Sequence, residues 1–185
     1  PLVPPSSPQP IVSKFDSGAS KHYFRQQDSH ALSSLASIRN GPQVQLPNKQ
    51  RIQAVSVGHL PLTSTKLTPH ATRTHVFTDL TNQSLVSLGQ LCDDACVAVL
   101  EDHQLNVYKK TNPTHRGPAY YTQTMKKDNL ILSGPRNFSD GLWDYHVPLP
   151  ATDGHAQPIT SGKSLTPARE THLHASMNAI IKKSQ

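Results

Sequence analysis

The apolar residues of this chain fall in short runs that end at turn residues, and this punctuation restricts the fold more than any other feature of the sequence. Residues 43–46 alternate between polar and apolar, residues 47–50 are a polar turn, and residues 51–56 alternate again. Alternation with a period of two on both sides of a polar turn predicts a β-hairpin. Runs this short do not favour a bundle of long helices.

The composition agrees with this pattern. Leu, Ile, Val and Phe together make up 41 of the 185 residues, whereas the chain contains 16 Pro and 9 Gly. Few large apolar residues and many turn formers favour short strands over long helices and require the core to be local.

Further short strands are predicted on either side of the hairpin. Apolar runs at 11–15, 75–80, 96–100 and 105–108 have the length of strands. Leu85, Leu88, Leu91 and Cys92 have the spacing of one helical face, which predicts a single helix of about two turns. The predicted fold class is therefore all-β with one short helix.

Four segments differ in composition. Residues 1–10 are a leader rich in Pro and Ser, expected to be extended, and residues 11–110 carry the strand-like pattern. Residues 111–150 are polar with two apolar islands, Leu130–Leu132 and Gly141–Trp143, and are expected to be an irregular extension. Residues 151–185 are expected to form a linker and a short helix over 171–185.

The net charge is +6, and the basic residues are dispersed rather than clustered. Residues 79–102 carry five acids and no Lys or Arg. A nucleic-acid interface is normally a clustered basic stripe with aromatic side chains, so we expect at most weak electrostatic binding. No run approaches 18 apolar residues, so no transmembrane helix is expected.

Two cysteines, Cys92 and Cys96, would share one face of a helix and could form half of a zinc site. No second Cys pair exists, and His70 and His75 have no Cys close by in the sequence. We therefore predict no metal and no cofactor, and interpret both thiols as buried core residues of a protein from a reducing compartment.

The sequence Asp16-Ser17-Gly18 is the sharpest chemical signal in the chain. An acid directly after an apolar strand, followed by Ser and Gly, places one carboxylate at a tight turn. The glycine there permits a close approach of another backbone. Because Asp-Ser-Gly is also a common turn sequence, an ordinary turn remains the alternative.

The surrounding sequence FDSGASKHYF resembles the active-site segment of the retropepsin-type aspartic proteases of copia-like retrotransposon polyproteins. Three further segments are similar to that family in the right order. VQLPNKQRIQAVSVGHLPL resembles its hairpin, NQSLVSLGQLCDDACVAVL its late strand, helix and strand, and ILSGPRNFSDGLWDYHVPLP the stretch that follows the protease. Together the four segments are spread over roughly residues 11–150.

The resemblance implies a retropepsin-like closed β-barrel over 11–110, followed by a protease-to-integrase connector over 111–150. It also implies an aspartic endopeptidase that hydrolyses peptide bonds of its own polyprotein. The implied catalytic residue is Asp16, with a flap over residues 47–58. The substrate-binding residues implied are Ser17, Gly18, Ala19, Ser20, Asn48 and Gly58.

Catalysis by aspartates needs two carboxylates about 3 Å apart that share one proton. Asp-Ser-Gly occurs once, and Asp140 and Asp153 precede Gly without the Ser. A homodimer that contributes Asp16 twice is therefore required, with Ser17 donating across the dimer axis.

Two alternatives stay open. The chain could be a catalytically silent, retroelement-derived dimerisation or binding module. It could also be a monomer whose barrel edge is covered by 111–150 through Leu130–Leu132 and Leu142-Trp143. The resemblance implies an intracellular, cytoplasmic location in a virus-like particle, no membrane partner, and nucleic acid only as part of the larger polyprotein.

Overall fold

The computed structural model describes residues 11–62, 64–111 and 118–149. The chain divides into one compact unit, Pro1–Gly154, and a second, His155–Gln185. The predicted leader at 1–10 and the linker and helix predicted within 151–185 lie outside the described residues. The fold given below is that of the first unit.

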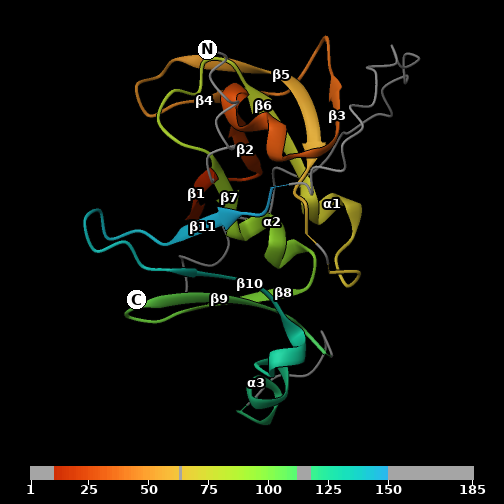
Figure 1. Ribbon diagram of the computed structural model, residues 1–185, viewed down its shortest axis with the longest axis vertical. Coiled ribbons are helices and arrows are strands. Elements are labelled where there is room, and N and C mark those ends of the chain that lie inside the picture. Colours follow the sequence, from red (N-terminus) through yellow and green to blue (C-terminus); the bar gives the residue numbers. More distant parts are fainter. Residues whose placement is uncertain (1–10, 63, 112–117, 150–185) are drawn as a thin grey trace, which may run out of the picture. The chain divides into compact units, whose positions relative to one another are not determined.

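Strands dominate the described residues, which confirms the prediction of a mostly β protein (Figure 1). The strands are β1 (Ile11–Asp16), β2 (His22–Arg25), β3 (Ser33–Ser37), β4 (Gln43–Gln45), β5 (Arg51–His59), β6 (Arg73–Phe77), β7 (Leu85–Ser87), β8 (Cys96–Leu100), β9 (Gln104–Lys109), β10 (Leu130–Pro135) and β11 (Asp144–Val147). The helices are α1 (Pro69–Thr72), α2 (Leu88–Asp93) and α3 (Pro118–Thr124), with 3₁₀ turns η1 (Gln26–Ala31) and η2 (Lys127–Asn129).

The prediction of one short helix is wrong, because the described residues contain three. Helix α1 has only four residues and no apolar period to reveal it. It begins at a local signal instead: the side chain of Thr68 accepts a hydrogen bond from the Ala71 amide, and Pro69 occupies the first turn. Helices of one or two turns depend on such caps rather than on periodicity.

Helix α2 also begins later than its apolar spacing predicts. Leu85 belongs to strand β7, and the helix starts only at Leu88. The Ser87 hydroxyl accepts a hydrogen bond from the Gln90 amide and so caps the helix at this point. The change from strand to helix therefore occurs at one serine.

The larger sheet has the strand order β11-β1-β7-β2-β6-β5-β3. Strand β4 pairs with the first three residues of β5, Arg51–Gln53. The order has two ends, so the sheet is curled but open, and the closed barrel of the sequence prediction is not what the described strands form. The pairs β1–β7 and β2–β6 are parallel, whereas the other pairs are antiparallel.

The parallel pair β1–β7 determines which loops meet. Asp16 lies opposite Ser87 in the register, and both are the last residues of their strands. Parallel strands end at the same edge of a sheet. The loop that follows Asp16 therefore lies beside the start of helix α2.

The hairpin predicted from the alternating pattern is present as β4 and β5. Ile52, Ala54 and Ser56 are buried, whereas Arg51 and Gln53 are exposed. The alternation thus places one face of β5 against the protein and the other in solvent. The turn between the strands is closed by two backbone hydrogen bonds: the Leu46 amide donates to the carbonyl oxygen of Gln50, and the Lys49 amide donates to that of Leu46.

Two clusters of buried side chains form the core. The larger one joins both sheets and helix α2, and its members include Phe15, Phe24, Val86, Leu91, Leu105, Val107, Leu132 and Tyr145. The smaller one lies under the β4–β5 hairpin and consists of Ile52, Ala54 and Phe77 with Tyr23, Ile38, Val44, Leu46 and Leu80 against them. The hairpin therefore has a core of its own.

The irregular extension predicted after residue 110 is not what the structure contains. Strand β10 pairs with β9 in a three-stranded sheet of order β10-β9-β8, and β11 pairs with β1 over Ile11–Lys14. Leu132 and Tyr145 join the larger core. The island Leu130–Leu132 looked isolated because its partner strand β9 lies more than twenty residues earlier in the sequence, and long-range pairing leaves no local pattern.

Gly134 shows how closely β10 approaches β11. A Cβ at this position would lie 1.8 Å from the carbonyl oxygen of Asp144 and 2.8 Å from the ring of Phe15. Only glycine permits this contact. Strands β10, β11 and β1 are therefore packed as one body.

No helix among the described residues is long and apolar enough to span a membrane.

Candidate functional site

Asp16 is the last residue of β1, and its carboxylate is held by the loop that follows. Its Oδ1 accepts hydrogen bonds from the amide of Gly18, at 2.7 Å, and from the amide of Ala19, at 3.2 Å. The side chain is half-buried, whereas Ser17 and Gly18 are exposed. The turn predicted from Asp16-Ser17-Gly18 thus presents one oriented carboxylate at an accessible edge.

The other residues predicted in this loop have separate roles. Ala19 is buried, and its carbonyl oxygen accepts a hydrogen bond from the Ser87 hydroxyl. Ser20 is exposed, and its hydroxyl lies 2.7 Å from the hydroxyl of Tyr23. The structure therefore brings all five residues from Asp16 to Ser20 into one short loop.

Tyr23 connects this loop to the hairpin. Its ring packs edge-to-face on Phe77, with the ring centroids 5.5 Å apart, and Phe77 belongs to the small core under β4 and β5. Successive side chains of a strand point to opposite faces, so Tyr23 packs against the smaller core and Phe24 belongs to the larger one. Ser20 therefore contacts Tyr23 directly, and the inner face of the hairpin contacts Tyr23 through Phe77.

The two residues predicted in the hairpin lie in different surroundings. Asn48 is exposed in the turn, where its Oδ1 accepts a hydrogen bond from the Gln50 amide at 3.0 Å. Gly58 is buried in β5, where a Cβ would lie 3.0 Å from Cβ of Leu32. Asn48 is available to a ligand, whereas Gly58 serves the close packing of the sheet.

A shallow cavity of about 270 Å³ lies along the hairpin and is lined by Gln43, Val44, Gln45 and Arg51. Asp16 does not line it. The Asp16 loop instead lies at an exposed end of strand β1.

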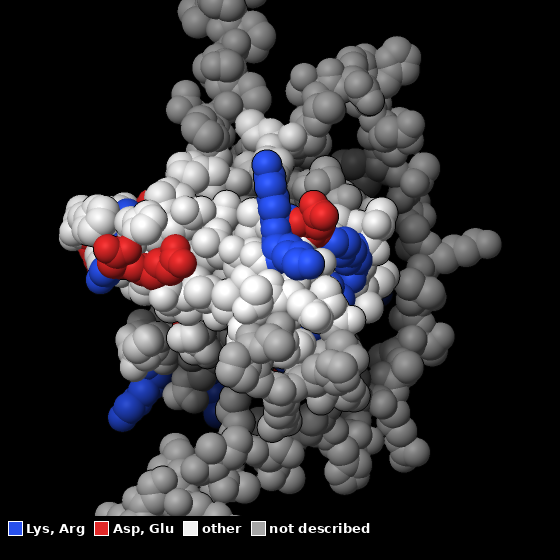
Figure 2. Space-filling model, turned by 90° about the horizontal axis from the view of Figure 1, so that it is seen from below, with Lys and Arg blue, Asp and Glu red and all other residues white. Residues whose placement is uncertain are grey.

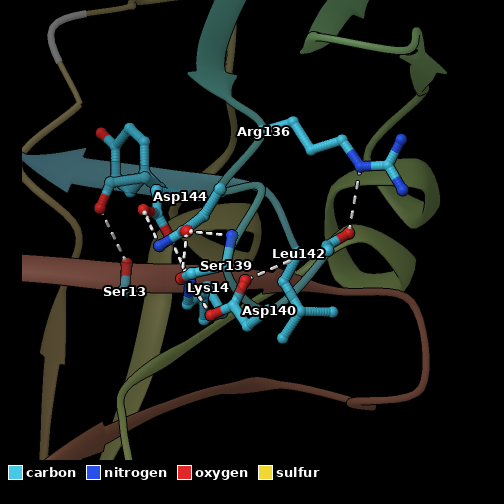
Figure 3. A network of polar contacts seen from close by, with 10 residues as sticks. Ser13, Lys14, Arg136, Ser139, Asp140, Leu142 and Asp144 are labelled. Carbon is cyan, nitrogen blue, oxygen red and sulfur yellow. Dashed lines mark hydrogen bonds and ion pairs between the residues drawn. The ribbon is translucent and has the colours of Figure 1, made fainter.

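Strand β1 is fixed behind Asp16 by a buried lysine (Figure 3). Lys14 is 7 % exposed, and its ammonium forms ion pairs with Asp140 and Asp144. Burial alone would lower the pKa of Lys14, but the hydrogen bonds and charges of the two aspartates outweigh it and raise the pKa. Lys14 is therefore charged at neutral pH.

The segment that carries Asp140 and Asp144 also contacts β1 through its backbone, and a cation–π contact lies within the segment. The Phe15 amide donates to the carbonyl oxygen of Trp143 at 3.0 Å, and the Arg136 guanidinium lies 5.3 Å from the centre of the Trp143 ring. Figure 3 shows Asp140 and Asp144 beside Lys14, whereas the Arg136 side chain extends away from these ion pairs. Asp140, which the sequence analysis excluded as a second catalytic acid, is thus a partner of Lys14.

A group of buried polar side chains beside the Asp16 loop escaped the sequence analysis. His22, Ser87 and Gln90 are all fully buried, and each hydrogen-bonds to another member of the group. Burial lowers the pKa of His22 to about 4, so its ring is neutral near pH 7. His22 lies in the segment that resembles the family, and its place six residues after Asp16 was the available signal.

The cysteines and charges suggest no further site. Cys96 is buried, and burial raises the pKa of its thiol to about 11, but Cys92 is exposed, so the prediction that both are core residues is wrong for Cys92. No three His, Cys, Asp or Glu side chains lie close enough to bind a metal in the part of the chain that the structure describes. On the face in Figure 2, acidic and uncharged side chains interrupt the basic ones.

Comparisons with protein-family models, with curated proteins and with solved structures find no match for this chain.

Proposed function

We propose that this chain is an aspartic endopeptidase of the retropepsin-like type and that it processes a copia-like retrotransposon polyprotein. One observation carries the proposal: the carboxylate of Asp16 stands at the exposed end of a strand, oriented by the amides of Gly18 and Ala19. The parallel strand β7 ends beside it at helix α2. The class of reaction, peptide-bond hydrolysis, is inferred from the four sequence segments that resemble the family.

The reaction requires two copies of the chain. Hydrolysis needs one carboxylate that takes a proton from water and a second that gives a proton to the scissile carbonyl oxygen. Each chain has one Asp-Ser-Gly sequence. In the proposed homodimer the two Asp16 loops meet, and the exposed Ser17 and Gly18 form part of the contact.

The two carboxylates of such a pair cannot both ionise freely at this distance. They share one proton and titrate as a pair with two apparent pKa values. Activity is therefore expected to have a bell-shaped dependence on pH, with its maximum where one proton is bound.

The substrate is expected to bind as an extended peptide. An extended chain can add to the exposed edge of a sheet through backbone hydrogen bonds. Ser20 and Asn48 are exposed polar side chains, and the loop and hairpin that carry them share Tyr23. The β4–β5 hairpin is the proposed flap that covers the peptide.

Asp16→Asn tests the proposal. The amide is nearly isosteric but cannot act as a base on water, so cleavage of a polyprotein fragment at mildly acidic pH should be lost while the fold is kept. Asp93→Asn is the control, because Asp93 is an exposed acid on helix α2. Cleavage retained by the Asp16 variant would refute the assignment.

A catalytically silent binding module would behave differently. The unsubstituted chain would then form dimers in sedimentation, yet it would cleave no polyprotein fragment at any protein concentration. The proposal extends to an intracellular setting within a particle, where nucleic acid is met as part of the larger polyprotein.

A further inference from the structure

The peptide unit of Ala19 is held on both sides. Its amide donates to Oδ1 of Asp16 at 3.2 Å, and its carbonyl oxygen accepts from the hydroxyl of Ser87. A rotation of this residue would break both contacts. The direction of the Asp16 carboxylate is therefore coupled to the Ser87 side chain.

The Ser87 hydroxyl has one proton to give, and its other partner fixes where that proton goes. The amide of Gln90 donates to the Ser87 oxygen at 3.0 Å, so the oxygen is an acceptor on that side. The proton must then point to the carbonyl oxygen of Ala19. Ser87 is fully buried.

Two further buried side chains fix Ser87. Nδ1 of His22 accepts from the Ser87 amide at 2.9 Å, so the ring proton is on Nε2 and is donated to the carbonyl oxygen of Ala71 at 2.7 Å. Oε1 of Gln90 accepts from the His22 amide at 2.9 Å. Nε2 of Gln90 donates to the carbonyl oxygens of His70 and Arg73.

In these contacts the donors and acceptors of the three side chains have hydrogen-bond partners. Both protons of the Gln90 amide and both nitrogens of the His22 ring have partners. A fully satisfied buried network is rigid, because each lost bond leaves a buried polar group without a partner. The network therefore has one low-energy arrangement.

We propose that Ser87 is a positioning residue for Asp16 and that His22 and Gln90 fix Ser87 for this task. This inference rests on the proposed function for its catalytic consequence. Ser87 does not touch substrate. It holds the Ala19 peptide, and that peptide holds the carboxylate in the direction that the partner Asp16 needs.

Ser87→Ala is the test, and Ser84→Ala is its matched control. Ser84, directly before the same strand, is also a fully buried serine, and its hydroxyl likewise makes two hydrogen bonds, to Asp28 and from the Arg25 amide. Both substitutions should therefore lower stability to a similar extent. Only the Ser87 variant removes the bond to the Asp16 loop.

Kinetics should separate the two variants. With the dimer saturated, we expect kcat of the Ser87 variant to fall at least about tenfold, with KM changed less than about twofold, since the contact serves the reacting geometry. An equal fall of kcat in both variants would overturn the inference.

A second measurement does not depend on catalysis. Amide hydrogen exchange at Gly18 and Ala19 should become at least about tenfold faster in Ser87→Ala and remain unchanged in Ser84→Ala. Unchanged exchange in the Ser87 variant would overturn the positioning role. Faster exchange in a chain that cleaves nothing would instead uphold the contact and refute the proposed function.

Discussion

Replacing Lys14 by Met tests whether the strand that carries Asp16 depends on the 136–144 loop. The substitution keeps an unbranched apolar chain of similar length but removes the ammonium that pairs with Asp140 and Asp144. The two aspartates that lose this partner differ in their exposure to water. The side chain of Asp140 is 39 % exposed and can be hydrated, whereas that of Asp144 is 14 % exposed and loses its charge partner.

The expected loss of unfolding free energy follows from this difference. Removal of one partner from a buried ion pair costs about 3–5 kcal/mol, and the exposure of Asp140 places this site near the lower end, at about 3 kcal/mol. Urea denaturation followed by the fluorescence of Trp143, which lies in the same loop, would measure it.

The double variant Lys14→Met, Asp144→Asn distinguishes an ion pair from simple packing. With no unpaired charge left, it should recover at least about half of the loss. A loss below about 1 kcal/mol in the single variant, or no recovery in the double variant, would refute the reasoning that this loop fixes β1 electrostatically.

Two further predictions concern other parts of the fold. Truncation after Lys110 removes β10 and β11 and uncovers core residues such as Phe15 and Val107. The shortened chain should therefore aggregate and lose activity. A stable, active product in size-exclusion chromatography would contradict the pairing of β10 with β9 and of β11 with β1. The pKa of His22 is about 4 in the folded state and 6.5 in the unfolded state. Between these pH values the unfolded chain binds more protons than the folded chain. The free energy of unfolding should therefore fall by roughly 3 kcal/mol as the pH drops from 6.5 to 4. Denaturation at pH 7 and pH 4.5 would measure this loss; substitution of the exposed His146 by Gln should leave it unchanged, and equal stability at both pH values would show that His22 is not buried as a neutral ring.

Local features were predictable from the sequence. The β4–β5 hairpin follows from alternation and a polar turn, and the Asp16 turn follows from the residues Asp, Ser and Gly. Each depends on neighbours within a few positions, where spacing and turn chemistry act directly. The mostly β character follows for the same reason.

Features that depend on distant partners were not predictable in this way. Strand β11 is defined by its pairing with β1, more than 120 residues earlier in the chain, and Lys14 is neutralised by Asp140 and Asp144 across the same distance. The His22, Ser87 and Gln90 network likewise joins two separate segments. Read alone, each of these residues is an ordinary polar residue, and only the sheet register brings them together.

The central claim, an active site shared by two chains, is tested most directly by mixing unsubstituted protein with the Asp16→Asn variant at constant total concentration. If subunits exchange freely and each active site needs Asp16 from both chains, activity should fall with the square of the unsubstituted fraction, so an equal mixture should keep about a quarter of the activity. Fluorescently labelled subunits would confirm that exchange is complete before the assay. An equal mixture that keeps half or more of the activity after complete exchange would show that one Asp16 suffices, and it would contradict the two-chain account.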